Sequence, residues 1–143
     1  MTSDDGWASL KNILPWLAEE KIPVTLFLNP LYMDGVHYQS RDSEKFLTKE
    51  EVADLTERYE PFITIASHGW SHKRSSDMSD DGFVENIQKA ESGLSDIPGK
   101  IAFFVFPFCS YSNSKSCRNN KETADTSFYG WDAESQRFFL HSS

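Results

Sequence analysis

Apolar positions along the chain form short unbroken runs that alternate with stretches of helical periodicity. Three apolar runs predict strands: Val24 to Leu28, which is typical of a buried strand, Phe62 to Ala66, and Ile101 to Phe106. Apolar residues three or four positions apart predict helices over Trp7 to Glu20, after Thr48, and over Phe83 to Leu94. Strands that alternate with helices indicate an α/β fold with a mostly parallel sheet.

Several residues mark where these elements begin and end. Thr48 followed three positions later by Glu51 is a capping box, so Thr48 is the expected N-cap of the second helix. Pro15 lies inside the first helical pattern and predicts either a kink or a later start of that helix. Other segments give a polar loop over Leu31 to Lys45, a helix cap at Asp80-Asp81-Gly82 and a last strand over Arg137 to Leu140.

The length of the chain indicates one domain, and its charge argues against two classes of binding partner. A chain of 143 residues can bury one proper core, so we expect a single domain over residues 1–143. Fourteen basic against twenty-two acidic side chains give a net charge of −8, which opposes binding to nucleic acid or to an anionic membrane surface. No stretch is apolar for long enough to predict a membrane-spanning helix.

Two groups of metal-ligating residues lie far apart in the sequence. Asp4 and Asp5 are adjacent near the start, and His68 and His72 are four positions apart just after the second predicted strand. Together they can supply three ligands to one divalent metal and leave one carboxylate free as a base. Functional groups of parallel α/β folds gather at the carboxyl ends of strands, where His68 is expected. No strand is predicted in front of Asp4.

Each group has a simpler interpretation when it is taken alone. Asp-Asp-Gly is an ordinary turn and helix-start signal, and the tripeptide recurs at residues 80–82. A histidine pair near a strand end can be two surface side chains. The combination of an acidic pair with a histidine pair at a strand end favours a shared metal site.

The pattern as a whole resembles a known family. Thr-x-Asp-Asp-Gly at residues 2–6, His-x-x-x-His after a strand, and an apolar strand that ends in Pro107-Phe108 resemble the polysaccharide deacetylase (NodB-homology, carbohydrate esterase family 4) family. The resemblance implies a distorted (β/α) barrel, here incomplete because its first strand is missing. It also implies a metal-dependent hydrolase that removes acetyl groups from N-acetylglucosamine polymers or from acetylated xylan.

The resemblance also implies roles for single residues. Asp4 would be the general base, and Asp5, His68 and His72 the metal ligands. His141 would be the general acid, although a histidine in a frayed tail is an equal alternative. Further residues would bind substrate: Pro107, Phe108, Tyr111, Trp131 and Leu140.

The motif around Pro107 departs from the family pattern in two respects. The family often carries an arginine just before this proline, where the present chain has Val105 and Phe106, and Cys109 stands where glycine is usual. Cys109 and Cys117 are either a disulfide pair or two free thiols.

These observations lead to one main hypothesis with alternatives. We expect a deacetylase with one divalent ion, zinc first, with cobalt, nickel or iron as alternatives. Its expected partner is an acetylated polysaccharide or oligosaccharide, in an extracellular, cell-surface or periplasmic location that the resemblance implies. The alternatives are an O-acetyl xylan esterase, a non-catalytic glycan-binding relative, and a fragment truncated at both ends. A fragment would expose sheet edges through which copies of the chain could associate.

Overall fold

The computed structural model describes residues 1–33, 45–109, 127–132 and 137–141, and from Cys109 onward it describes the main chain alone. Six strands form the sheet: β1 (Thr2–Asp4), β2 (Val24–Leu28), β3 (Ile63–Ser67), β4 (Lys100–Phe104), β5 (Ser127–Asp132) and β6 (Arg137–His141). The α-helices are α1 (Leu14–Glu19), α2 (Pro30–Met33), α3 (Lys49–Arg58) and α4 (Asp80–Leu94). Three 3-10 segments complete the list: η1 (Ala8–Asn12), η2 (Ser75–Asp77) and η3 (Pro107–Cys109).

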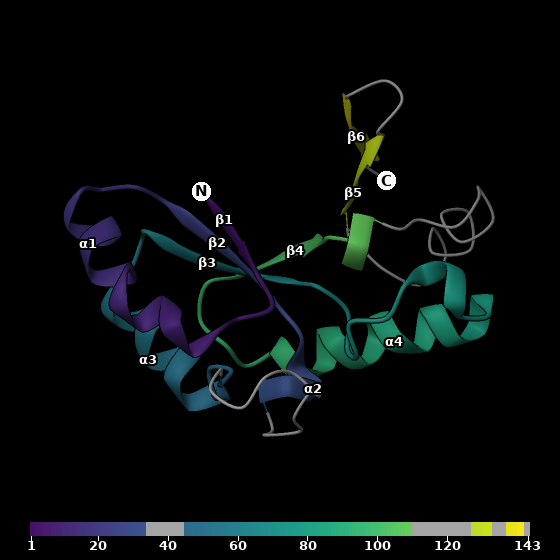
Figure 1. Ribbon diagram of the computed structural model, residues 1–143, viewed down its shortest axis with the longest axis horizontal. Coiled ribbons are helices and arrows are strands. Elements are labelled where there is room, and N and C mark those ends of the chain that lie inside the picture. The colour runs from purple at the N-terminus through teal and green to yellow at the C-terminus, as the bar shows by residue number, and fades with distance from the viewer. Residues whose placement is uncertain (34–44, 110–126, 133–136, 142–143) are drawn as a thin grey trace.

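The six strands lie in the sheet in the order of the sequence, from β1 to β6. Each of the first four strands is parallel to the next, and among the described strands only β5 and β6 pair in antiparallel fashion. Sequential parallel order is the arrangement of a (β/α) barrel, in contrast to the reversed order of a doubly wound sheet. Figure 1 shows β5 and β6 as a hairpin that projects away from the helices.

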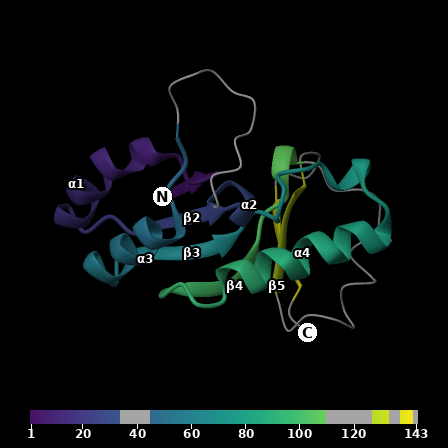
Figure 2. The ribbon, with the colours of Figure 1, turned by 90° about the horizontal axis from the view of Figure 1, so that it is seen from below.

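The two faces of the sheet have different neighbours: helices cover one face, and aromatic side chains contact each other on the other. Figure 2 shows α3 and α4 along one face, and Figure 1 shows the same helices below the strands. The core on this face joins the helices to alternate strand residues, among them the fully buried Leu26 and Ile65. On the other face, Phe27 contacts Phe103, with ring centroids 5.7 Å apart. Among the described residues, no helix has the length and apolar character needed to cross a membrane.

The expected α/β fold with a mostly parallel sheet is confirmed, and the three predicted strands are present within three residues of their expected ends. The capping box is also confirmed: the hydroxyl of Thr48 accepts from the Glu51 N–H at 3.2 Å, and the Glu51 carboxylate accepts from the Thr48 N–H at 3.0 Å. The last strand, β6, includes the residues that the sequence predicted and extends to His141.

Other expectations about the elements were wrong. The absence of a strand in front of the aspartates was predicted, but Thr2–Asp4 form β1, which pairs with β2 along its whole length. Three residues are too short to give a periodic signal. The first helix is divided into η1 and α1, and Pro15 occupies the first turn of α1, where its missing N–H costs no hydrogen bond.

Two more differences concern helix starts. The loop expected from Leu31 begins instead as the short helix α2, which buries Tyr32 and Met33. Residues 34–44 of the expected loop lie outside the described part of the chain. The N-cap of α4 is Ser79, whose hydroxyl accepts from the Gly82 N–H at 3.2 Å. Asp80 and Asp81 therefore lie within the first turn, where negative charge is favourable.

Candidate metal centre

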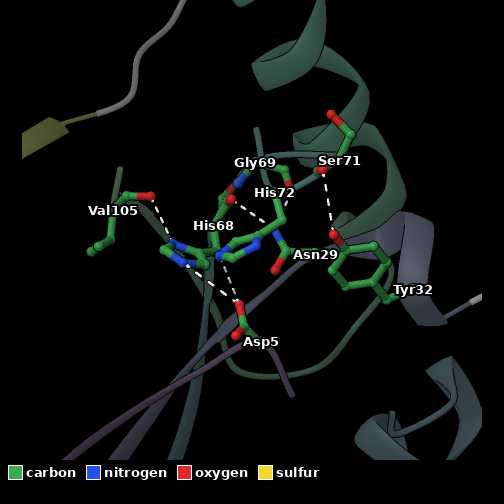
Figure 3. Close-up of polar contacts among 9 residues, drawn as sticks. Asp5, Asn29, Tyr32, His68, Gly69, Ser71, His72 and Val105 are labelled. Atoms are coloured by element: carbon green, nitrogen blue, oxygen red, sulfur yellow. Dashed lines mark hydrogen bonds and ion pairs between the residues drawn. The ribbon is translucent and has the colours of Figure 1, made fainter. Parts of the chain in front are cut away.

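Asp5, His68 and His72 meet at the carboxyl ends of β1 and β3, with one ligand atom of each residue within 4.8 Å of the others. Oδ1 of Asp5 lies 3.1 Å from Nε2 of His72 and 3.7 Å from Nε2 of His68. Figure 3 shows both imidazole rings above the Asp5 carboxylate. The two groups that the sequence separates by more than sixty residues are thus neighbours in space.

The turn after β1 sets the position of Asp5. Asp5 and Gly6 both have left-handed backbone conformations, with φ of 68° and 75°, and the Gly6 N–H donates to the Asp4 carbonyl at 2.9 Å. A Cβ atom on Gly6 would lie 2.6 Å from Cδ2 of the buried Leu28. Glycine is therefore required at position 6 both for its conformation and for its closeness to β2.

His68 is almost fully buried, and its ring is held by the residue that directly follows β4. Nδ1 of His68 lies 2.9 Å from the carbonyl oxygen of Val105, which can only accept, so Nδ1 carries the proton. The lone pair of Nε2 then faces Asp5, and this is the arrangement that metal-binding histidines require. Burial lowers the pKa of His68, against the opposing effects of the Val105 hydrogen bond and the charges of Asp4 and Asp5.

Aromatic rings surround His72 on two sides. Its backbone is left-handed, with φ of 49°, and its ring centroid lies 4.6 Å from that of Phe108 and 6.2 Å from that of Tyr32. Phe108 also has a positive φ, of 59°, and the guanidinium carbon of Arg74 lies 5.0 Å from the centroid of its half-exposed ring. Strained residues of this kind persist where surrounding contacts determine them, and they cluster at functional sites.

The donor set fits a divalent cation. Oδ1 of Asp5 is buried and accepts no hydrogen bond among the described residues, which is costly unless another group neutralises it. Two ligands about 2.0–2.1 Å from a tetrahedral ion are separated by about 3.3 Å. The separations of 3.1 and 3.7 Å lie on either side of that value. A carboxylate and two neutral imidazoles suit zinc and several other transition metals.

A groove of about 790 Å³ opens beside His72 and follows α4, and this volume lies within the usual range of ligand sites. Aromatic and charged side chains line it. Its lining consists of Leu31, Tyr32, Trp70, Ser71, His72, Lys73, Arg74, Asp77, Met78, Gly82, Glu85, Asn86, Lys89 and Phe108. The groove therefore begins at one member of the cluster, His72, and is large enough for a small ligand.

The remaining predicted site residues have different outcomes. Asp4 ends β1 and is exposed next to the cluster, and Pro107 and Phe108 begin η3. Tyr111 and Cys117 lie outside the described residues. Trp131 lies on β5, and Leu140 and His141 lie on β6, where only the main chain is described. Their catalytic and binding roles stay predictions.

The main-chain register bears on His141. Phe104 at the end of β4 pairs with Phe128 of β5, which in turn pairs with His141 of β6. Strands lie about 4.8 Å apart, so the main chain of His141 is about 10 Å from that of Phe104. Val105, whose carbonyl bonds to His68, directly follows Phe104. The main chain of His141 is thus the end of strand β6, and the role of this residue as general acid stays a prediction.

Sequence reasoning missed the residues that support the cluster. They are Asn29, Asn86 and the carbonyl of Val105, which bond to His68 or to the loop that follows it. Asn29 directly follows a predicted buried strand, a position that could have drawn attention to it. A main-chain carbonyl leaves no signal in the sequence.

Comparisons with known proteins agree with this geometry. A family model described as polysaccharide deacetylase matches residues 1–125. Comparison with the sequences of curated proteins gives no match.

Three of the similar solved structures illustrate the fold. IcaB from Ammonifex degensii is 17% identical, with a TM-score of 0.66 over 88% of this chain and 56% of that one. A family 4 carbohydrate esterase from Streptomyces lividans in complex with acetate is 16% identical, with a TM-score of 0.66 over 92% and 60%. A family 4 carbohydrate esterase from Bacillus anthracis is 18% identical, with a TM-score of 0.65 over 90% and 57%.

The chain spans less than two thirds of the length of each of these structures, and at these identities the likeness shows the fold. The family model covers most of the chain, and the range that it matches contains Asp5, His68 and His72. The chain therefore belongs to the polysaccharide deacetylase family.

Proposed function

We propose that this chain hydrolyses acetyl groups of an N-acetylglucosamine-containing glycan with the help of one divalent metal ion. The single observation that carries the proposal is the buried, unsatisfied Oδ1 of Asp5 beside Nε2 of two histidines. Burial of such a cluster costs free energy without a cation, and a bound cation offsets that cost. Family membership supports the acetylated carbohydrate as substrate.

In this mechanism Asp5, His68 and His72 hold the metal, and Asp4 acts as the base. A bound metal supplies Lewis acidity, which polarises the acetyl carbonyl and acidifies a water molecule. Asp4 is exposed and adjacent to Asp5, so it can remain off the metal and take a proton from the attacking water. The Nδ1–H bond to Val105 keeps the lone pair of His68 directed at the cation.

Amide hydrolysis also requires a proton for the leaving nitrogen. The water oxygen bonds to the acetyl carbon, the C–N bond breaks, and the products are acetate and a glycan amine. We assign delivery of the proton to His141 on β6; in support, its main chain is paired with Phe128, which is paired with Phe104 at the end of β4. Loss of this group would slow the step in which the amine leaves.

The groove beside His72 is the proposed seat of the neighbouring sugar units. Tyr32, Trp70 and Phe108 line it, and aromatic faces offer apolar contact area to the flat faces of sugar rings. The side chains of Ser71, Asn86 and Lys73 supply polar groups for sugar hydroxyls along the same groove. Tyr111, Trp131 and Leu140 remain proposed additions to this surface.

A direct test compares two matched variants. Asp4→Asn should reduce acetate release from N-acetylglucosamine oligomers by about 10²–10⁴-fold, the usual contribution of a general base, and should leave metal content unchanged. Asp80→Asn alters the same position of the second Asp-Asp-Gly, on α4 away from the cluster, and should retain full activity. Equal activity of Asp4→Asn and the unaltered protein would refute the assigned base.

One observation favours a second candidate, a glycan-binding relative without turnover. Val105 and Phe106 stand where the family pattern has an arginine that orients the base. For this candidate, calorimetry should detect binding of N-acetylglucosamine oligomers. No acetate should be released, whichever divalent metal is added. Acetate release from acetylated xylan instead would identify an ester substrate.

A further inference from the structure

The loop that carries the two candidate histidines has an unfavourable backbone. Gly69 has φ of 80° and His72 has φ of 49°, so the chain leaves β3 through two left-handed residues. The left-handed conformation costs a non-glycine residue roughly 1–2 kcal/mol. Contacts from outside the loop must therefore hold this conformation.

Asn29 bonds to the first half of the loop. It follows β2 and is completely buried, and its Nδ2 donates to the carbonyl oxygens of His68 at 2.7 Å and Gly69 at 2.9 Å. Two carbonyl acceptors fix which end of the amide is nitrogen. Figure 3 shows Asn29 directly beside the loop, between the two histidines and Tyr32. The side chain thus joins the end of β2 to the start of the loop.

Asn86 bonds to the second half from the opposite element, α4. Its Oδ1 accepts from the Trp70 N–H at 3.0 Å, and its Nδ2 donates to the Ser71 hydroxyl at 2.8 Å. The close approach depends on Gly69, because a Cβ atom at that position would lie 2.8 Å from Oδ1 of Asn86. Each residue from His68 to Ser71 therefore bonds to one of two asparagines.

We propose that Asn29 and Asn86 are positioning residues that hold this loop in the form in which His68 and His72 face one cation. The proposal rests on the metal site of the proposed function and is independent of hydrolysis. Polar partners one layer beyond the ligands typically change metal affinity by 10–100-fold. Asn86 acts without touching either imidazole, through the main chain of Trp70 and the hydroxyl of Ser71.

Cobalt titration of the full chain, followed by visible absorption, tests the proposal. Asn86→Leu keeps the size of the side chain, favours the helix and removes both bonds, so it should weaken cobalt binding at least tenfold. Asn86→Asp keeps the acceptor for Trp70, and the Ser71 hydroxyl can turn to donate to it, so cobalt binding should stay within about threefold. Gln88 is exposed on the same helix, and Gln88→Leu and Gln88→Asp control for the apolar and the charged replacement.

The outcomes separate this proposal from the proposed function. Equal cobalt affinity of Asn86→Leu and the unaltered protein would overturn the positioning role, as would equal losses in Asn86→Leu and Asn86→Asp. If Asn86→Leu fails to fold, Ser71→Ala removes one partner of Asn86 and should weaken cobalt binding two- to fivefold; no change would overturn the role. A protein that binds cobalt in this pattern but releases no acetate supports the positioning role and refutes hydrolysis.

Discussion

Replacement of Gly6 by alanine tests whether the turn after β1 fixes the site. The new Cβ atom would lie 2.6 Å from Cδ2 of Leu28, in a backbone with φ of 75°. The left-handed conformation costs alanine about 1–2 kcal/mol. Displacement of the fully buried Leu28 adds roughly 1–3 kcal/mol, as in other overpacked cores. We therefore expect a loss of about 2–5 kcal/mol in the free energy of unfolding.

The assay is urea denaturation of the metal-free protein, followed by circular dichroism. Gly82→Ala is the matched control, because Gly82 lies in the first turn of α4 without a left-handed backbone and its Cβ would meet only the Ser79 hydroxyl, at 3.1 Å. This control should change stability by less than about 1 kcal/mol. Gly6→Ala should also weaken cobalt binding, since any relief of the contact moves Asp5. Equal stability of the two variants would refute the reasoning.

Three further expectations concern the cap, the core and the metal. Thr48→Ala removes the hydroxyl that accepts from the Glu51 N–H at the start of α3 and should lower the free energy of unfolding by about 1 kcal/mol, as urea denaturation would measure. Leu94→Ala removes a fully buried side chain where α4 meets the core, and should cost about 2–5 kcal/mol in the same measurement. Chelation should lower the melting temperature of the loaded protein, because a ligand at a hundredfold excess over its Kd stabilises the native state by about 2.7 kcal/mol. In the His72→Ala variant, calorimetry should give the same melting temperature with and without the chelator.

The parallel sheet was predictable because its central strands β2 and β3 are largely buried and are therefore continuous apolar runs. Val24–Leu28 and Ile63–Ser67 are of this kind, and their order in the chain with helices between them indicates parallel pairing. β1 escaped prediction because its three residues are polar and only partly buried. Its pairing with β2, which no local pattern encodes, makes it a strand.

The approach of Asp5 to the histidines was also predictable, although its details were not. Parallel strands end at one edge of the sheet, so residues that follow them meet there, whatever their separation in the sequence. The left-handed backbones of Asp5 and His72 could not be foreseen, because non-glycine residues rarely adopt them. They follow from the fit of each turn against its neighbours, such as Gly6 against Leu28.

The residues that support His68 come from the ends of neighbouring strands, and for this reason they could not be recognised in the sequence. Asp5 directly follows β1 and His68 directly follows β3. Asn29 directly follows the intervening β2, and the Val105 carbonyl directly follows β4. The two ligand-bearing strands carry residues whose chemistry identifies them. The other two contribute an amide and a main-chain oxygen, whose importance arises only from their position beside His68. A change at β2 or β4 therefore acts on the cation through His68, and metal affinity is the property in which such a change should first be detected.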